Sequence, residues 1–408
     1  MKIRTITLFT DPGWPVRDEI FAAAGRMAQA ARAAFAEAGY EVQTVRLATP
    51  PFPQLLGRDN ASQAVHLAQE VEAAGFVQNI EYLSLGPVRL DDEAAFVEVI
   101  PDVVEATQNV FVSLSVAEAE AGISLLAVRR AAQAVLRIAA VGSDGLATLR
   151  FGALARVPAG VPFFPAGYAL PGPDTFSLGV EAADVIVQAV ETAHTLAEAR
   201  GFIVEQVEEY GRRLASAAKE VAASTGYRFG GIDFSPAPFP GEARSLGRAF
   251  ERLGAPRVGW HGTLAAAAFV ADALDRAQFP RAGFCGLFLP VLEDTLLAGR
   301  AGEGSLTVAD LLTYSAVCGT GLDTVPLPGD IDADDLAAII LDVAALALRL
   351  AKPLTARLMP VPGCKAGDEV KWDFPYFVAG RVLAPRAGGL GGLLAGVERF
   401  DLAEKVAQ

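Results

Sequence analysis

Cysteine and histidine are both scarce in this chain of 408 residues, which holds three of each. No cysteine belongs to a Cys-x-x-Cys pair, and no two histidines are close enough in sequence to form a ligand pair. A disulfide framework and a structural zinc site are therefore disfavoured, and we expect a reducing cytoplasm as the compartment. The six residues are Cys285, Cys318, Cys364, His66, His194 and His261.

Three common motifs of nucleotide binding and nucleophilic catalysis are missing. The chain has no Gly-x-x-x-x-Gly-Lys-Ser/Thr loop, and no Gly-x-Gly-x-x-Gly follows its first expected strand. It also lacks the Gly-x-Ser-x-Gly turn that exposes a nucleophilic serine. These absences disfavour a P-loop site, a Rossmann dinucleotide site and a hydrolase of the nucleophile-elbow type.

Basic residues are outnumbered, since 34 Lys and Arg stand against 48 Asp and Glu and give a formal net charge of −14. Nucleic acid and anionic membrane surfaces are bound through basic faces, so we expect neither partner. The longest apolar segments carry charges at helical spacing, and the first residues do not follow the pattern of a signal peptide. An acidic, solvated surface is therefore expected on a soluble protein.

Strand-like apolar runs alternate with alanine-rich helical runs along nearly the whole chain. This alternation predicts an α/β protein with helices outside a sheet or barrel. Thr307 and Asp310 predict a cap at the start of one helix. Strands are expected at 2–9, 41–47, 80–85, 110–115, 148–156, 228–234, 286–290, 322–325 and 355–360. Helices are expected at 17–38, 123–139, 202–224, 243–253, 263–277, 308–316 and 334–350.

No linker rich in proline, serine or charge divides the chain, so we expect one barrel-like domain over residues 1–408. A proline cluster at 158–175 is the best candidate for a seam within it. Pro50, Pro51 and Pro53 predict a loop after the second strand. Glycines at 388–392 predict a partly mobile tail over 386–408.

The most informative stretch begins where an expected strand ends in Asp233-Phe234-Ser235, followed by three alternating prolines. Asp233 and Ser235 then lie near a strand end, which is where α/β folds place their ligands. The alternative is a rigid connector without a chemical role.

His261 and Thr263 open an alanine-rich helix within the string Gly-Trp-His-Gly-Thr. A histidine at a helix start can act as an acid or base, or bind an anion together with free backbone N–H groups. The alternative is a histidine that only caps or packs.

Glu293 and Asp294 directly follow an apolar strand. Two acids at a strand end can act as a general base or hold a weakly bound divalent cation. Adjacent acids also commonly cap the helix that follows them.

Cys318 stands between a helix end and a Gly-x-Gly turn, and Asp323 lies within the next strand. A thiol exposed there can serve as a nucleophile, with Asp323 as an orienting group. The alternative for Cys318 is a small buried hydrophobic residue.

Read in order, these segments resemble one family. They are Asp-x-Ser-x-Ala-Pro-x-Pro from Asp233, His-Gly-Thr from His261, Leu-Pro-Val-x-Glu-Asp up to Asp294, and Val-Cys-x-x-Gly-Leu-Asp up to Asp323. Lys-Pro-Leu-Thr-Ala-Arg, ending at Arg357, and Met-Pro-Val-Pro-Gly close the pattern. Over nearly its whole length the chain resembles the domain-of-unknown-function family 711, also called uncharacterised protein family 0210.

The resemblance implies a barrel like that of pyruvate formate-lyase and other glycyl radical enzymes, with strands inside and helices outside. It does not imply their chemistry. The nearest counterpart of the radical loop, Arg-Val-Leu-Ala-Pro from Arg381, has Ala384 where the radical glycine would stand. We therefore expect no glycyl radical, although Cys318 is placed like the thiol that those enzymes hold inside the barrel. No cofactor is implied.

Two functions are compatible with these residues. The first is a non-radical enzyme that acts on a small anionic metabolite at the barrel mouth, where Arg4 and Arg357 can clamp a carboxylate or phosphate. Its catalytic candidates, expected to converge on one pocket, are His261, Glu293, Asp294, Cys318 and Asp323.

The second function is a small-molecule-binding or regulatory protein that keeps the barrel without catalysis. For the arginines, the alternative to ligand binding is a structural role, because a buried arginine on a strand often forms an ion pair with an acid. No sequence feature fixes the ligand or the oligomeric state, so a homo-oligomer stays open.

Overall fold

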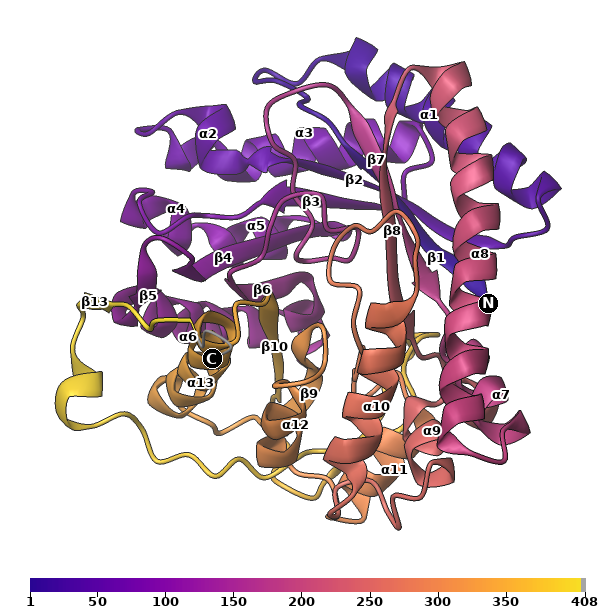
Figure 1. The fold of residues 1–408 in the computed structure, drawn as a ribbon. Coiled ribbons are helices and arrows are strands. Elements are labelled where there is room, and N and C mark those ends of the chain that lie inside the picture. The colour runs from indigo at the N-terminus through magenta and orange to yellow at the C-terminus, as the bar shows by residue number, and fades with distance from the viewer. Residues whose placement is uncertain (405–408) are drawn as a thin grey trace.

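One large mixed sheet runs through the molecule (Figure 1). The structure, a computed structural model, describes residues 1–404. Hydrogen-bonded neighbours follow the order β8-β7-β1-β2-β3-β4-β6-β10-β9. The strands are β1 (Lys2–Phe9), β2 (Val42–Pro51), β3 (Tyr82–Gly86), β4 (Val110–Glu118), β5 (Gly122–Ser124), β6 (Phe151–Ala155), β7 (Thr175–Glu181), β8 (Arg228–Ala237), β9 (Gly321–Pro328), β10 (Leu354–Val361), β11 (Glu369–Val370), β12 (Gly380–Arg381) and β13 (Arg399–Phe400).

The five central strands of this order are parallel to one another, and the two flanks run the opposite way. β7 pairs antiparallel with β1, and β10 pairs antiparallel with β6. β8 then continues parallel to β7, and β9 continues parallel to β10. Parallel neighbours need long crossover connections, which explains why most strands are separated by helices.

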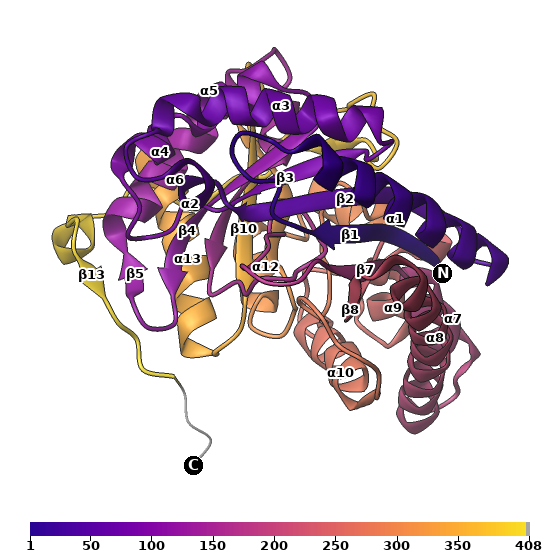
Figure 2. The same ribbon diagram turned by 90° about the horizontal axis from the view of Figure 1, so that it is seen from above.

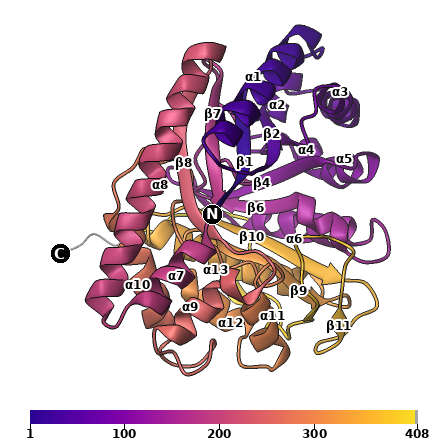
Figure 3. The same cartoon turned by 90° about the vertical axis from the view of Figure 1, so that its right-hand side faces the viewer.

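The helices lie outside the strands (Figures 2 and 3). Helices α1, α3 and α5 cover one side, while α8 and α10 cover another (Figure 2). Within residues 1–404 none of them is long and apolar enough to cross a bilayer. They are α1 (Asp18–Glu37), α2 (Phe52–Leu56), α3 (Ala64–Val77), α4 (Ala94–Glu98), α5 (Ile100–Ala106), α6 (Leu125–Ala139), α7 (Ala183–Thr192), α8 (Leu196–Thr225), α9 (Leu246–Arg252), α10 (Thr263–Arg276), α11 (Thr295–Gly302), α12 (Val308–Tyr314) and α13 (Ala333–Arg349).

The two faces of the central strands differ in chemistry. In β2, Val45 and Leu47 belong to the main apolar core beneath the helices. Thr44 and Arg46 alternate with them and must point to the opposite face, yet both are buried as well. The strands therefore have a second buried face, more polar than the first, and this polar interior contains the candidate site.

A segment without regular secondary structure, at 284–292, hydrogen-bonds to both ends of the strand order, β8 and β9. The backbone N–H of Phe284 donates to Asp233 of β8 at 2.7 Å. The N–H of Val291 donates to the carbonyl of Asp323 in β9 at 3.2 Å. The strand expected at 286–290 is thus an irregular connection. It hydrogen-bonds to side chains of β8 and to the backbone of β9.

Most of the expected elements form, and the exceptions have local causes. The predicted cap of Thr307 and Asp310 is confirmed as a capping box at α12. The loop predicted from prolines is wrong, because β2 continues to Pro51 beside Gly86 and α2 follows at once. A side chain at residue 86 would lie 2.5 Å from the backbone of Pro50, so only glycine permits this pairing.

Strands from both sides of the predicted seam at 158–175 belong to the same sheet. β6 precedes the seam and pairs with β10, whereas β7 follows it and pairs with β1. The predicted tail is described up to residue 404, and residues 405–408 lie outside the described part. Its β13 pairs with β5, and Glu404 forms an ion pair with Arg156 at 2.7 Å.

Candidate functional site

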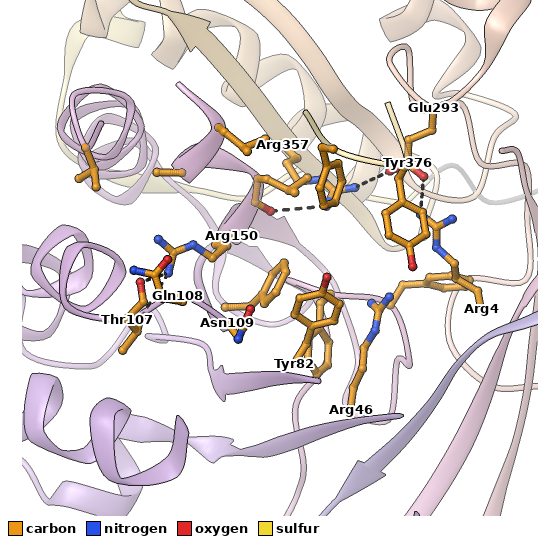
Figure 4. Close-up of a pocket in the computed structure, with 18 of the residues that line it drawn as sticks. Arg4, Arg46, Tyr82, Thr107, Gln108, Asn109, Arg150, Glu293, Arg357 and Tyr376 are labelled. Atoms are coloured by element: carbon orange, nitrogen blue, oxygen red, sulfur yellow. Dashed lines mark hydrogen bonds and ion pairs between the residues drawn. The ribbon is translucent and has the colours of Figure 1, made fainter. Parts of the chain in front are cut away.

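A cavity of about 370 Å³ opens into the polar interior (Figure 4). Its wall takes side chains from β1, β2, β3, β4, β8 and β10, which are brought together by the sheet order. Gln108 and Gly142 line it and are exposed, so they mark its mouth. The volume falls in the range of pockets that bind small molecules.

A buried network of charges forms one wall of the cavity (Figure 4). Glu293 accepts from Arg4 at 2.6 Å and lies 3.8 Å from Arg357. Arg357 also donates through Nε to Asp323, and Arg4 also pairs with Glu181 at 3.4 Å. Each of these side chains is less than a tenth exposed. Such a network is stable only while every charge keeps its partner.

The pKa of Glu293 is raised above its ordinary value. Burial is the main cause, because water no longer stabilises the carboxylate. The charge of Arg4 opposes the shift, and the nearby negative charge of Asp323 adds to it. A buried carboxyl group whose pKa is raised holds a proton more readily than an exposed one, which suits a proton-transfer group.

Within residues 1–404, Arg46 lines the cavity without an acidic partner and with only its Nε engaged. Its Nε donates to Thr44 at 3.0 Å, and no acceptor within residues 1–404 reaches its two Nη groups. The guanidinium lies 5.4 Å from the ring centres of Tyr82 and Phe164. Burial, helped by the charge of Arg4, lowers the pKa of Arg46 to about 10. It still carries its charge at neutral pH, at a cost in desolvation.

Aromatic rings make up much of the remaining wall. Seven of the 22 lining residues are aromatic, against 8% of the whole chain, so the cavity is enriched in flat apolar surface. The rings contact one another, as in the pair Phe163 and Phe288 at 5.0 Å. They are Tyr82, Phe111, Phe163, Phe164, Phe288, Phe374 and Tyr376.

The structure brings part of the expected site together. Arg4, Arg357 and Glu293 line the cavity, and Asp323 lies directly behind them against Arg357. The two arginines are engaged by acids, which is the structural ion pair that the sequence left open. They are therefore less available to a ligand than the expected clamp would require.

Asp294, although adjacent to Glu293, has a different environment. Its carboxylate caps α11 by accepting from Leu297 N–H at 3.1 Å. It also accepts from Ser245 Oγ at 2.5 Å and from Leu246 N–H at 2.6 Å, at the start of α9. One buried carboxylate thus joins two helix N-termini, where negative charge is stabilised.

We expect Asp294→Ala to lower the free energy of unfolding by about 3 kcal/mol, because a cap and several charge-assisted hydrogen bonds are lost together. Urea denaturation measures this loss. The exposed His261 supplies the control, and His261→Ala should change stability by less than about 0.5 kcal/mol. Equal effects of the two substitutions would contradict the structural role of Asp294.

His261 and Thr263 do not reach the cavity. His261 is exposed on the loop before α10. Thr263 is buried at the start of this helix, where its hydroxyl donates to the carbonyl of Arg257 at 3.3 Å. His261 lies in the turn before α10 and Thr263 is the first residue of this helix, and neither side chain caps the helix or lines the cavity.

Cys318 is buried and also lies off the cavity wall. Its Sγ accepts from Gly321 N–H at 3.4 Å, as a packed thiol inside a turn does. The neighbouring Gly319 contacts Gly286, where a side chain would come within 2.5 Å of the Gly319 backbone. These glycines therefore allow two backbone segments to approach each other, instead of a backbone and a ligand.

Asp233 and Ser235 organise the segment that follows α10. Asp233 accepts from Ser235 Oγ at 2.6 Å and from Cys285 N–H at 2.9 Å. Ser235 Oγ accepts in turn from Gly286 N–H at 3.2 Å. Both side chains are fully occupied in this way, which matches the rigid connector considered from the sequence.

The acids at 293 and 294 turn to different partners, so they do not share a cation position. Within residues 1–404, no group of three or more His, Cys, Asp or Glu side chains could hold a metal ion.

Sequence reasoning missed Arg46, Tyr82 and Tyr376. Arg46 falls within the strand expected at 41–47 and was not considered as a site residue, because a charged residue on a strand usually faces solvent. The available signal was the alternation itself, because Thr44 and Arg46 share one face of a strand. A strand buried on both faces gives the same pattern, and only the arrangement of the surrounding elements distinguishes the two cases.

The fold and the site define an α/β protein with a buried arginine–carboxylate network beside an aromatic cavity. The chain belongs to the family described as "Uncharacterised ACR (DUF711)", whose model matches residues 1–373. The suspected family is thereby confirmed. Phe374 and Tyr376 of the cavity wall lie just beyond the matched residues.

Three relatives illustrate the similarity. A "UPF0210 protein" of Pyrobaculum islandicum is 35% identical over 352 residues, covering 81% of this chain and 76% of the relative. A "UPF0210 protein" of Syntrophobacter fumaroxidans is 30% identical over 376 residues, covering 88% and 82%. One of Clostridium botulinum is 27% identical over 374 residues, also covering 88% and 82%.

Proposed function

We propose that the protein is a non-radical enzyme that acts on a small anionic metabolite in this cavity, with Glu293 as its proton-transfer group. The observation that carries the proposal is a fully buried carboxyl group on a cavity wall, held between Arg4 and Arg357. The arginines fix its position, while burial raises its pKa above the ordinary value. Both conditions favour general acid–base catalysis.

The anionic character of the substrate rests on Arg46, a cation of the same cavity. Arg46 is buried and has no acidic partner among residues 1–404, and a bound anion would supply one. Asp323 is proposed as a positioning residue, because it holds Arg357 and adds negative charge near Glu293. His261, Asp294 and Cys318 have no part in this proposal.

We also propose that the strands form a barrel like that of pyruvate formate-lyase. The support is the segment 284–292, which hydrogen-bonds to β8 on one side and β9 on the other. A barrel would explain why Arg4, Arg46 and Arg357, from strands spread along the sheet order, surround one cavity.

A second candidate, a binding or regulatory protein without catalysis, is favoured by a specific observation. Both carboxylate oxygens of Glu293 face arginines, and neither cysteine nor histidine lines the cavity within residues 1–404. A ligand could then bind without any reacting side chain beside it.

Incubation with a cell metabolite extract, followed by mass spectrometry, distinguishes the two functions. An enzyme should deplete one anionic metabolite in proportion to time and protein concentration. The Glu293→Gln variant should leave that metabolite unchanged. Retention of a metabolite in stoichiometric amount, without depletion, would support the binding protein and contradict the enzyme.

A further inference from the structure

Arg46 offers two hydrogen-bond donors that face empty cavity space. The side chain is 9% exposed, and only its Nε is engaged, by Thr44. Figure 4 shows the guanidinium between Tyr82 and Tyr376, toward the centre of the cavity. A guanidinium presents paired N–H groups whose spacing matches the two oxygens of a planar carboxylate.

Tyr82 and Tyr376 add donors beside this cation. Neither hydroxyl hydrogen-bonds to another group within residues 1–404, and both residues line the cavity. Burial raises the pKa of Tyr82, so its hydroxyl keeps its proton at neutral pH and can donate. Tyr376 also covers Arg4, whose guanidinium carbon lies 4.1 Å from the ring centre.

The other charges of the cavity favour a single negative charge on the ligand. Arg4 and Arg357 are already paired with acids. Arg150 is engaged as well, because its guanidinium donates to the carbonyls of Val104 at 2.7 Å and Thr107 at 2.8 Å. No lysine lines the cavity within residues 1–404, so Arg46 is the cation left there to pair with a ligand, and one guanidinium balances one negative charge.

The surface around Arg46 is aromatic and suits a flat ring. Tyr82 and Phe164 flank the guanidinium, and Phe111 contacts both rings at 5.5 Å. Stacked and edge-on contacts between rings contribute binding free energy beyond that of the buried apolar area alone.

We propose that the cavity is a binding site for an aromatic monocarboxylate, whose carboxylate pairs with Arg46 and whose ring packs among Tyr82, Phe111 and Phe164. This inference rests on the proposed function in that it names the substrate class of the same cavity. It adds Arg46 as the binding residue and assigns the two tyrosine hydroxyls to the carboxylate.

Isothermal titration calorimetry with four probes tests this site in the unmodified protein. Benzoate should bind, and its neutral isostere benzamide should bind about 10- to 100-fold more weakly, because it lacks the charge-assisted pair. Acetate should be weaker than benzoate because it lacks the ring, and inorganic phosphate should not compete with benzoate. Equal affinity for benzoate and benzamide, or stronger binding of acetate or phosphate, would overturn the proposal.

Two substitutions then locate the site. Arg46→Met should weaken benzoate binding about 100-fold, and it should not lower the melting temperature, because it removes an unpaired buried charge. Arg58→Met removes an exposed arginine and should leave the affinity unchanged. If Arg46→Met fails to fold, Tyr376→Phe serves instead and should weaken the binding of both benzoate and acetate, because it removes a hydroxyl donor to the carboxylate. Unchanged benzoate binding in a folded Arg46→Met protein would overturn the proposal.

The outcomes separate this inference from the proposed function. Depletion of an aliphatic or phosphorylated metabolite, without benzoate binding, would overturn the inference and leave the enzyme standing. Benzoate binding through Arg46, without depletion of any metabolite, would support the inference and count against the enzyme.

Discussion

Glu293→Gln is expected to reduce turnover of the substrate by about 10²- to 10⁴-fold, which is the usual contribution of a general acid or base. Glutamine keeps the shape of the side chain and an oxygen for Arg4, but it cannot exchange a proton. Binding of the substrate should be retained or tightened, because a negative charge near the anion is removed. Turnover and dissociation constant, measured separately, distinguish these two effects.

Glu181→Gln is the matched control for this experiment. Glu181 is a buried glutamate that also pairs with Arg4, but it does not line the cavity. Its substitution should change turnover far less than that of Glu293. Equal losses in the two variants would mean that the charge network is only structural, and would contradict the assignment of Glu293.

The pH dependence of turnover gives a second test of Glu293 as the proton-transfer group. The negative charge of Asp323 helps to raise the pKa of Glu293, so Asp323→Asn should lower that pKa. The limb of the rate profile governed by Glu293 should then move to lower pH. A purely structural Asp323 would reduce stability without moving the limb.

Arg357→Met is expected to lower the free energy of unfolding by about 3–5 kcal/mol, because it leaves buried acids without their partner. Asp323 depends most on Arg357, since its other oxygen is buried and has no hydrogen-bond partner within residues 1–404. Urea denaturation of the variant measures the loss, provided that the transition remains cooperative.

The double variant Arg357→Met with Asp323→Asn should recover part of that stability, since no unpaired charge then remains at this position. Arg300→Met is a suitable comparison, because Arg300 pairs with Glu251 at 2.7 Å in a more exposed position. We expect it to cost only about 1 kcal/mol. Strictly additive losses in the double variant would contradict a coupled buried pair.

The strands and helices with strong apolar periodicity could be predicted from the sequence. β1 forms over the expected residues, and α1 differs from the expected helix by one residue at each end. β7 was not assigned as a strand, and Gly179 within it packs against the ring of Phe163, which is distant in sequence. Such an element depends on a tertiary contact, and local pattern does not contain it.

The site could be predicted only in part, because the sequence shows residue types and not the direction in which they point. The adjacent acids Glu293 and Asp294 look equivalent as a string, yet one lines the cavity and the other caps two helices. Arg46, in contrast, was not predicted as a site residue although it lines the cavity. Its strand alternates polar and apolar residues as a strand with one solvated face does. Its buried position follows only from the arrangement of the whole sheet.

The most direct test of the account is a crystal structure of the protein in the presence of benzoate. The account predicts the carboxylate within hydrogen-bond distance of the two Nη groups of Arg46, and the ring against Tyr82 and Phe164. Benzoate at any other place, or Arg46 turned away from the cavity to pair with an acid, would contradict it.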